Sequence, residues 1–149
     1  MNLLKAAGFS YDSSIHPTWV PGRYNHLARP TRTHLQDGIV RVPVAVSPLM
    51  RLPVSWIWFR NYPKSLLQIL GRSLAARRDA LCLYFHNWEF VDLQRAAPGL
   101  PRSVARNTGE AFARRLARFV ELCKKRGFVP CTIIEHVRSG YDTVDHAES

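Results

Sequence analysis

The chain has 149 residues, 46% of them hydrophobic and 21% charged, which fits one globular domain with a hydrophobic core. No apolar run reaches the roughly 18 to 20 residues of a membrane-spanning helix. The first residues lack the apolar stretch of a secretory signal, so the default expectation is the cytoplasm. Three Cys residues without a CxxC pair support neither a disulfide scaffold nor a structural zinc module.

Basic residues outnumber acidic ones by 21 to 11, which gives a net charge of +10. A basic chain can be steered toward nucleic acid, anionic lipid or an acidic glycan. The basic residues are scattered from Arg23 to Arg138 without a run of five, a pattern more typical of an Arg-rich composition than of a nucleic-acid stripe. A nucleic-acid binder nevertheless stays open as an alternative, with its contacts on one helix at Arg114, Arg115, Arg118, Lys124, Lys125 and Arg126.

The first part of the chain reads as short strands separated by a long loop. Residues 16–37 are rich in Pro, Gly, Arg, His and Asn and lack periodicity, and loops of this length are usually functional. The segments expected around it are a helix end at Leu3–Ala7 stopped by Gly8, a strand at Phe9–Ser13, a strand at Ile39–Val46 in which Pro43 indicates an edge or a bulge, and a strand or buried turn at Val54–Phe59.

The second part alternates helices with strands. Leu residues at helical spacing predict a helix from Pro63 to about Arg78, and the apolar run Ala80–Phe85 predicts a strand covered on both faces of a parallel sheet. The remaining segments expected are a loop at 92–106, a helix with Asn107 as its N-cap that ends at Gly127, a strand at Phe128–Ile134 and a polar tail from Arg138. The helix carries one apolar stripe, formed by Phe112, Leu116, Phe119, Val120 and Cys123. This order predicts an α/β protein with parallel pairing, which is part of a larger barrel or sheet.

His86 and Asp12 are the candidate catalytic residues. His86 follows the buried strand, and reactive groups in α/β barrels gather at the carboxyl ends of strands. An imidazole there can exchange a proton near neutral pH, or it can simply bond a backbone carbonyl. Asp12 ends the first strand and could orient His86, bind a substrate hydroxyl or start an Asx turn.

The segment Pro17–His26 is the candidate ligand-binding loop. It combines the aromatic rings of Trp19 and Tyr24 with the guanidinium of Arg23 and the imidazole of His26. That mixture suits sugar recognition, in which rings stack on the sugar and polar groups bond its hydroxyls. It also suits a structural loop that Trp19 pins under the core.

No metal ligand is assigned. His16, His26, His34 and Glu89 are present, but the chain has no HxxxH, HExxH or DxD spacing that would put two ligands on one face. It has no GxSxG motif of a serine hydrolase either. The three Cys residues lie in apolar segments and are most simply core residues.

Several segments resemble polysaccharide deacetylases of the NodB-homology (carbohydrate esterase) group. The resemblance covers about Leu3 to Ile134, and its most specific part is LYFHNWEF, which ends a strand in a histidine and continues in a Trp-Glu-Phe turn. The other matching segments are GFSYDSSIHPTWVPGRYNH, VPVAVSP, LPVSWIWFRN and RNTG…RL…F…GFVP.

The resemblance implies a distorted (β/α) barrel that removes N-acetyl groups from amino-sugar glycans with a divalent metal such as zinc. His86 matches the general acid that protonates the leaving amine, and Leu83 matches a hydrophobic residue that lines the acetyl pocket. Asp12 lies where the family has a strand-end aspartate. Trp88 and the loop near Trp19 would shield the site from water.

The family's TFDD-type, HxxxH-type and arginine motifs do not occur in this sequence. The chain therefore resembles the C-terminal part of a deacetylase domain, over residues 1–137, followed by a polar tail at 138–149. The metal-binding half would come from an upstream chain, and the partner would be an N-acetylated amino-sugar glycan. The alternative from another class is a non-catalytic protein that binds carbohydrate or a partner through the Trp19–His26 loop.

Overall fold

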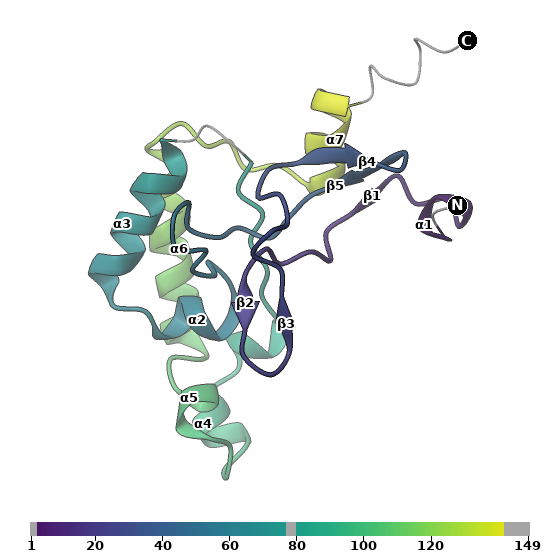
Figure 1. The fold of residues 1–149 in the computed structure, drawn as a ribbon. Helices are drawn as coiled ribbons and strands as arrows, with labels where there is room; N and C mark the ends of the chain where they lie inside the picture. Colours follow the sequence, from purple (N-terminus) through teal and green to yellow (C-terminus); the bar gives the residue numbers. More distant parts are fainter. Residues whose placement is uncertain (1–2, 77–79, 142–149) are drawn as a thin grey trace, which may run out of the picture.

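The computed structural model describes residues 3–76 and 80–141, so the predicted helix end near Arg78 and the tail beyond Tyr141 lie outside the described residues. No helix in those two ranges is long and apolar enough to cross a membrane. Figure 1 shows how the elements are arranged. In chain order they are α1 (Leu3–Ala6), β1 (Tyr11–Asp12), β2 (Trp19–Val20), β3 (Tyr24–Asn25), β4 (His34–Gln36), β5 (Ile39–Arg41), α2 (Trp56–Asn61), α3 (Lys64–Ala75), the 3₁₀ helix η1 (Asn87–Phe90), α4 (Leu93–Ala96), α5 (Arg102–Ala105), α6 (Glu110–Lys124) and α7 (Ile133–Tyr141).

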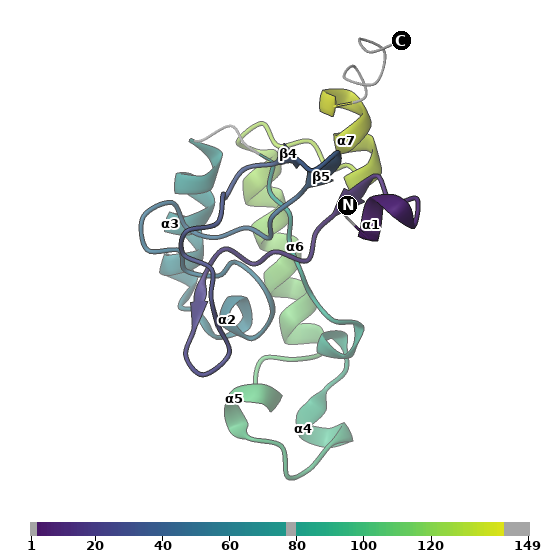
Figure 2. The ribbon, with the colours of Figure 1, turned by 45° about the vertical axis from the view of Figure 1, so that its right-hand side comes forward.

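The described strands form two small open sheets. β5 is the central strand of a three-stranded sheet, in which it pairs in parallel with β1 and antiparallel with β4. β2 and β3 form a separate antiparallel hairpin inside the predicted long loop. In both views α7 lies beside the three-stranded sheet, and α4 and α5 lie at the opposite end of the molecule (Figures 1 and 2). The barrel remains a prediction.

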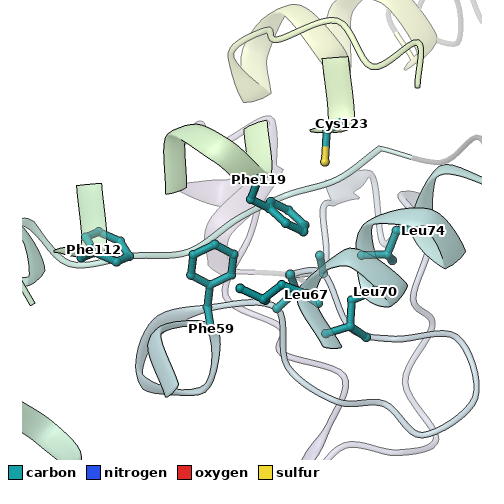
Figure 3. Close-up of a cluster of buried hydrophobic side chains, with 9 residues drawn as sticks. Phe59, Leu67, Leu70, Leu74, Phe112, Phe119 and Cys123 are labelled. Atoms are coloured by element: carbon teal, nitrogen blue, oxygen red, sulfur yellow. The ribbon is translucent and has the colours of Figure 1, made fainter. Parts of the chain in front are cut away.

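The main core lies between α2, α3 and α6. Phe59 is fully buried there, with its ring centroid 5.1 Å from that of Phe85 and 5.2 Å from that of Phe119. Leu67, Leu70 and Leu74 of α3 close the cluster from the other side (Figure 3). Edge-to-face rings at these distances stabilise the core beyond the area that they bury.

The two long helices confirm the prediction from periodicity. α3 buries its predicted Leu face, and α6 buries Phe112, Phe119 and Cys123 of the predicted stripe. The N-cap prediction for α6 is wrong: Gly109 is the N-cap, with a φ of 65°. Asn107 instead donates from its amide to the Arg60 carbonyl, because the chain turns toward α2 before the helix begins.

For Val54–Phe59 a strand or a buried turn was predicted, and the strand is wrong, since α2 begins at Trp56. The aromatic composition of this segment favours a strand, but that preference is weak compared with tertiary packing. A helix puts Phe59 and Arg60 side by side in the interior, where both are fully buried. The core contacts of Phe59 therefore decide the local structure.

No strand forms at Phe128–Ile134, because α7 begins at Ile133. Thr132 and Glu135 form a capping box: the Glu135 carboxylate accepts the Thr132 N–H at 2.6 Å, and the Thr132 hydroxyl accepts the Glu135 N–H at 3.3 Å. This T-x-x-E signal was present in the sequence. It starts a helix where the apolar residues predicted a strand.

The segment 80–85 is extended but is not a strand buried on both faces. One parallel bridge joins Cys82 to Val44, and Leu81 and Leu83 are only partly buried. Tyr84 is 46% exposed. The predicted loop at 92–106 contains the one-turn helices α4 and α5, and the predicted loop at 16–37 contains β2, β3 and β4.

Candidate acid–base site around His86

His86 lies at the end of the extended segment 80–85, where two backbone hydrogen bonds hold the chain. The Ala45 N–H donates to the Cys82 carbonyl at 2.8 Å, and the Trp56 N–H donates to the Tyr84 carbonyl at 3.0 Å. The chain then turns into η1 at Asn87. The His86 side chain is 30% exposed, so a ligand can reach it from solvent.

Both ring nitrogens of His86 have polar neighbours. Nε2 lies 2.7 Å from the Tyr84 hydroxyl, and Nδ1 lies 3.4 Å from Oε1 of Glu89. The same carboxylate oxygen accepts the backbone N–H of His86 at 3.1 Å. A carboxylate accepts hydrogen bonds only, so Glu89 favours the tautomer of His86 that carries a proton on Nδ1. The imidazole therefore has a carboxylate on one side and a replaceable hydroxyl on the other.

Glu89 is held in place by Arg60, and both side chains are fully buried. Arg60 Nε lies 2.9 Å from Glu89 Oε2, and Arg60 Nη1 donates to the carbonyls of Val104 and Arg106 at 2.9 Å each. Burial lowers the pKa of Arg60, and the Glu89 carboxylate opposes that shift. A buried pair fixed at both ends gives the carboxylate one position.

Aromatic rings enclose the imidazole. Trp88 stacks on it with centroids 4.9 Å apart, and Trp56 meets it edge-on at 5.4 Å. The Arg60 guanidinium carbon lies 5.7 Å from the centre of the Trp88 ring. Trp56 adopts a φ of 46°, a conformation that costs a bulky residue on the order of 1–3 kcal/mol and that clusters at functional sites.

A second histidine cluster lies next to this site. His16 is 3.4 Å from the Tyr24 hydroxyl through Nδ1 and 3.4 Å from the Ser55 hydroxyl through Nε2. The ring of Tyr24 stacks on His26 at 4.7 Å. Burial lowers the pKa of His16, and the nearby His26 lowers it further. His16 thus links Tyr24 of the predicted ligand-binding loop to Ser55, and Ser55 directly precedes Trp56 of the His86 site. The loop and the site are therefore neighbours.

The other predicted binding residues are spread around this centre. Trp88 and the pair Tyr24 and His26 lie at or beside the site, as described above. Trp19 is 57% exposed, so the alternative in which it pins the loop under the core is wrong. Arg23 is exposed in the turn between β2 and β3. Leu83 packs against the main core.

Asp12 does not orient His86. Its carboxylate forms an ion pair with Arg41 and accepts the Ser14 N–H at 3.0 Å, which is the Asx turn among the three alternatives. Burial raises the pKa of Asp12, but the hydrogen bonds from Ser14 and Arg41 outweigh burial and hold it below its ordinary value. The nearest strand partner, β5, supplies the arginine, so Asp12 stabilises the sheet.

The described residues do not fit a metal ion. Over 3–76 and 80–141 no group of three or more His, Cys, Asp or Glu side chains lies close enough to hold one. Cys123 is buried, as predicted for a core residue, and Cys82 is partly buried. Cys131 is exposed, so its assignment to the core was wrong.

Three residues of the site were missed as functional residues. Tyr84 is two residues before His86 on an extended segment, so it shares a face with His86, and that alternation was a usable signal. Glu89 was considered only as a metal ligand. Nothing in the sequence around Arg60 indicated that it pairs with Glu89, because the two residues are 29 positions apart in the chain.

The fold and the site define a small protein of mixed helices and strands with a histidine–carboxylate pair at its centre. The sequence matches the family described as Domain of unknown function (DUF3473) over residues 13–134. The chain therefore belongs to this family. Neither the curated proteins nor the solved structures contain a significant match.

Proposed function

We propose that this chain supplies the proton-donating side of a polysaccharide deacetylase site, which acts on N-acetylated amino-sugar glycans when a complementing polypeptide supplies the metal-binding side. The observation that carries the proposal is the pairing of a solvent-accessible His86 with the buried Glu89 carboxylate. The resemblance of LYFHNWEF to the deacetylase motif supports the same role for His86.

The chemistry assigned to this chain is one proton transfer. The Glu89 carboxylate accepts a hydrogen bond from Nδ1 and orients the ring, while in the protonated ring Nε2 carries the proton that can be given away. In the structure the Tyr84 hydroxyl occupies the position next to Nε2, and a substrate nitrogen would take that position. As the amide C–N bond breaks, the proton moves from Nε2 to the leaving amine.

Trp88 and Trp56 limit the access of water to this proton. Their rings contact the imidazole on one face and one edge, and the Tyr84 ring lies 4.9 Å from it, so a substrate that reaches Nε2 has to displace the Tyr84 hydroxyl. Exclusion of water strengthens the electrostatic interaction between the carboxylate and the imidazolium. Because the described residues do not fit a metal, no step assigned to this chain involves one.

The proposal is tested by acetate release from chitooligosaccharides. The chain alone should release no acetate, with or without added zinc, and a complex with the complementing segment should. In that complex His86→Ala should lower kcat by roughly 10² to 10⁴ and leave metal affinity nearly unchanged. Full kcat in the variant, or loss of metal binding, would show that His86 is not the general acid.

The predicted loop provides the matched control. If Tyr24 and His26 contact sugar, His26→Ala should raise KM and leave kcat close to the wild-type value, because the loop binds without touching the reacting bond. A parallel fall in kcat for both histidine variants would indicate a loss of folding rather than a loss of the acid. Thermal melting of each variant separates the two explanations.

A non-catalytic glycan binder is the second candidate, and the exposure of Trp19 favours it. Its ring is 57% exposed on a two-stranded hairpin, where it can stack on a sugar. Binding of chitooligosaccharide by the chain alone, lost in Trp19→Ala and kept in His86→Ala, would support this candidate over the catalytic one.

A further inference from the structure

A groove of about 810 Å³ lies between α3 and α6, and its lining contains neither His86 nor Glu89. The two helices pack side by side (Figures 1 and 2), with Gly71 of α3 close to Leu122 and Phe119 of α6. Neither the acid–base site nor the predicted ligand-binding loop contributes to it. The groove is therefore a separate feature of the surface.

Both edges of the groove are basic. Lys64 and Arg72 line it from α3, and Arg114, Arg118 and Lys125 line it from α6. Glu121 is the acidic residue of the lining, and its carboxylate already pairs with Lys124. Arg114 pairs with Glu110. Lys125 also lies close enough to Glu121 to lower the pKa of that carboxyl, after the larger effects of the hydrogen bond and charge of Lys124. Within the described residues Lys64, Arg72 and Arg118 form no ion pair, so the groove carries unneutralised positive charge on both the α3 and the α6 side.

The floor of the groove is mainly apolar. It is lined by the buried Leu67 and Phe119, the partly buried Leu122 and the small side chains of Ala111 and Ala117, and Gln68 adds one polar side chain. Arg115 is partly buried, donates to the Tyr62 carbonyl at 2.5 Å and so serves the fold rather than the groove. Burial lowers the pKa of Arg115, in line with this position. An occupant must match two basic edges and an apolar strip between them.

We propose that this groove binds an acidic amphipathic helix of a partner protein. Acidic residues on the flanks of such a helix pair with the two edges, and its apolar stripe covers the floor. The lining from Ala111 to Lys125 spans about 21 Å of helix, which accommodates about 14 residues of a partner helix.

Charge and shape together favour this partner over nucleic acid. A duplex presents phosphates to the edges but offers nothing apolar to Leu67, Phe119 and Leu122. A membrane surface is flat and meets the edges without filling the strip between them. Arg72 and Arg118, which form no ion pair within the described residues, are available for carboxylates, because the planar fork of arginine binds a carboxylate through two hydrogen bonds.

The experiment uses the full chain and a labelled synthetic helix of Glu and Leu with one acidic and one apolar face, measured by fluorescence anisotropy at physiological ionic strength. A peptide of the same composition in shuffled order, a short DNA duplex and phosphatidylserine vesicles are the comparisons. We expect the amphipathic peptide to bind at least about tenfold more tightly than the shuffled peptide.

Two double variants locate the binding. Arg72→Glu with Arg118→Glu reverses both edges of the groove and should weaken binding by about tenfold or more. Arg95→Glu with Arg102→Glu makes the same change in net charge on exposed residues of α4 and α5 and should change it by less than about twofold, because salt screens distant charges. Melting curves verify that each variant folds.

Four results would overturn the proposal: no binding of the amphipathic peptide, equal binding of the shuffled peptide, equal loss in the two double variants, or stronger binding of the duplex or the vesicles. The last of these would assign the groove to nucleic acid or to an anionic membrane instead. None of them depends on deacetylase activity, so this inference and the proposed function are tested separately.

Discussion

The Arg60–Glu89 pair couples the stability of the fold to the geometry of the site. Arg60 comes from α2 and Glu89 from η1, and both are fully buried. The desolvation of two charges makes such a pair a poor source of net stability, yet removal of one partner leaves the other charged and unpaired. Its benefit is the fixed position of the carboxylate beside His86.

Arg60→Met should therefore destabilise the protein by about 3–5 kcal/mol, since Glu89 loses its countercharge in the interior. The double variant Arg60→Met with Glu89→Leu should recover a large part of that loss. Urea unfolding of Arg60→Met, Glu89→Leu and the double variant measures the coupling between the two positions. A cost below about 1 kcal/mol for Arg60→Met would contradict a buried pair of this kind.

His16 makes stability depend on pH. Its pKa is lowered in the folded protein by burial and by His26, so the unfolded chain binds a proton more readily. Stability should then fall as the pH drops through about 6.5, the ordinary pKa of histidine. Thermal melting between about pH 7.5 and pH 5.5 measures this, and His16→Gln should reduce the dependence. An unchanged slope in the variant would assign it to other groups.

At the scale of elements, the spacing of apolar residues predicted secondary structure better than the capping signals did. The Leu spacing of α3 and the apolar stripe of α6 predicted both helices, because each repeats over several turns. Short segments were predicted poorly. A strand was expected at the aromatic α2 and another at the start of α7, where segments of six and seven largely apolar residues are compatible with either structure.

The capping box makes α7 testable. Thr132→Ala removes the hydroxyl that accepts the Glu135 N–H and should cost about 0.5–2 kcal/mol of stability. Thr132→Ser keeps the acceptor and should cost much less. Chemical denaturation of both variants gives the comparison, and equal losses would mean that the threonine acts through packing of its methyl group.

At the scale of the whole molecule, an open apolar surface runs along the segment that leads to His86. A groove of about 570 Å³ is lined there by Leu81, Leu83, Phe128 and Val129, and Val129 is 82% exposed. Within the described residues, the backbone hydrogen bonds of the segment 80–85 lie on one edge, where its carbonyls accept from the N–H groups of Ala45 and Trp56. An unpaired edge of extended chain invites pairing with another polypeptide.

The chain by itself should accordingly self-associate or be poorly soluble at micromolar concentration, and a complementing segment should relieve this. Sedimentation velocity over a concentration series measures the association. Val129→Lys places a charge on the exposed apolar surface and should reduce it. A sharply melting monomer at every concentration would contradict the prediction.

The sequence by itself determined the helices with long repeats, the turn at Gly8 that follows α1 and the place of His86 after an apolar extended run, because neighbours along the chain decide those features. Only the tertiary structure decided which charges meet. Asp12 pairs with Arg41 and Glu89 with Arg60, each across 29 residues, and no local pattern selects one arginine among 17. The free energy of such pairs depends on burial, which exists only once distant segments have packed together.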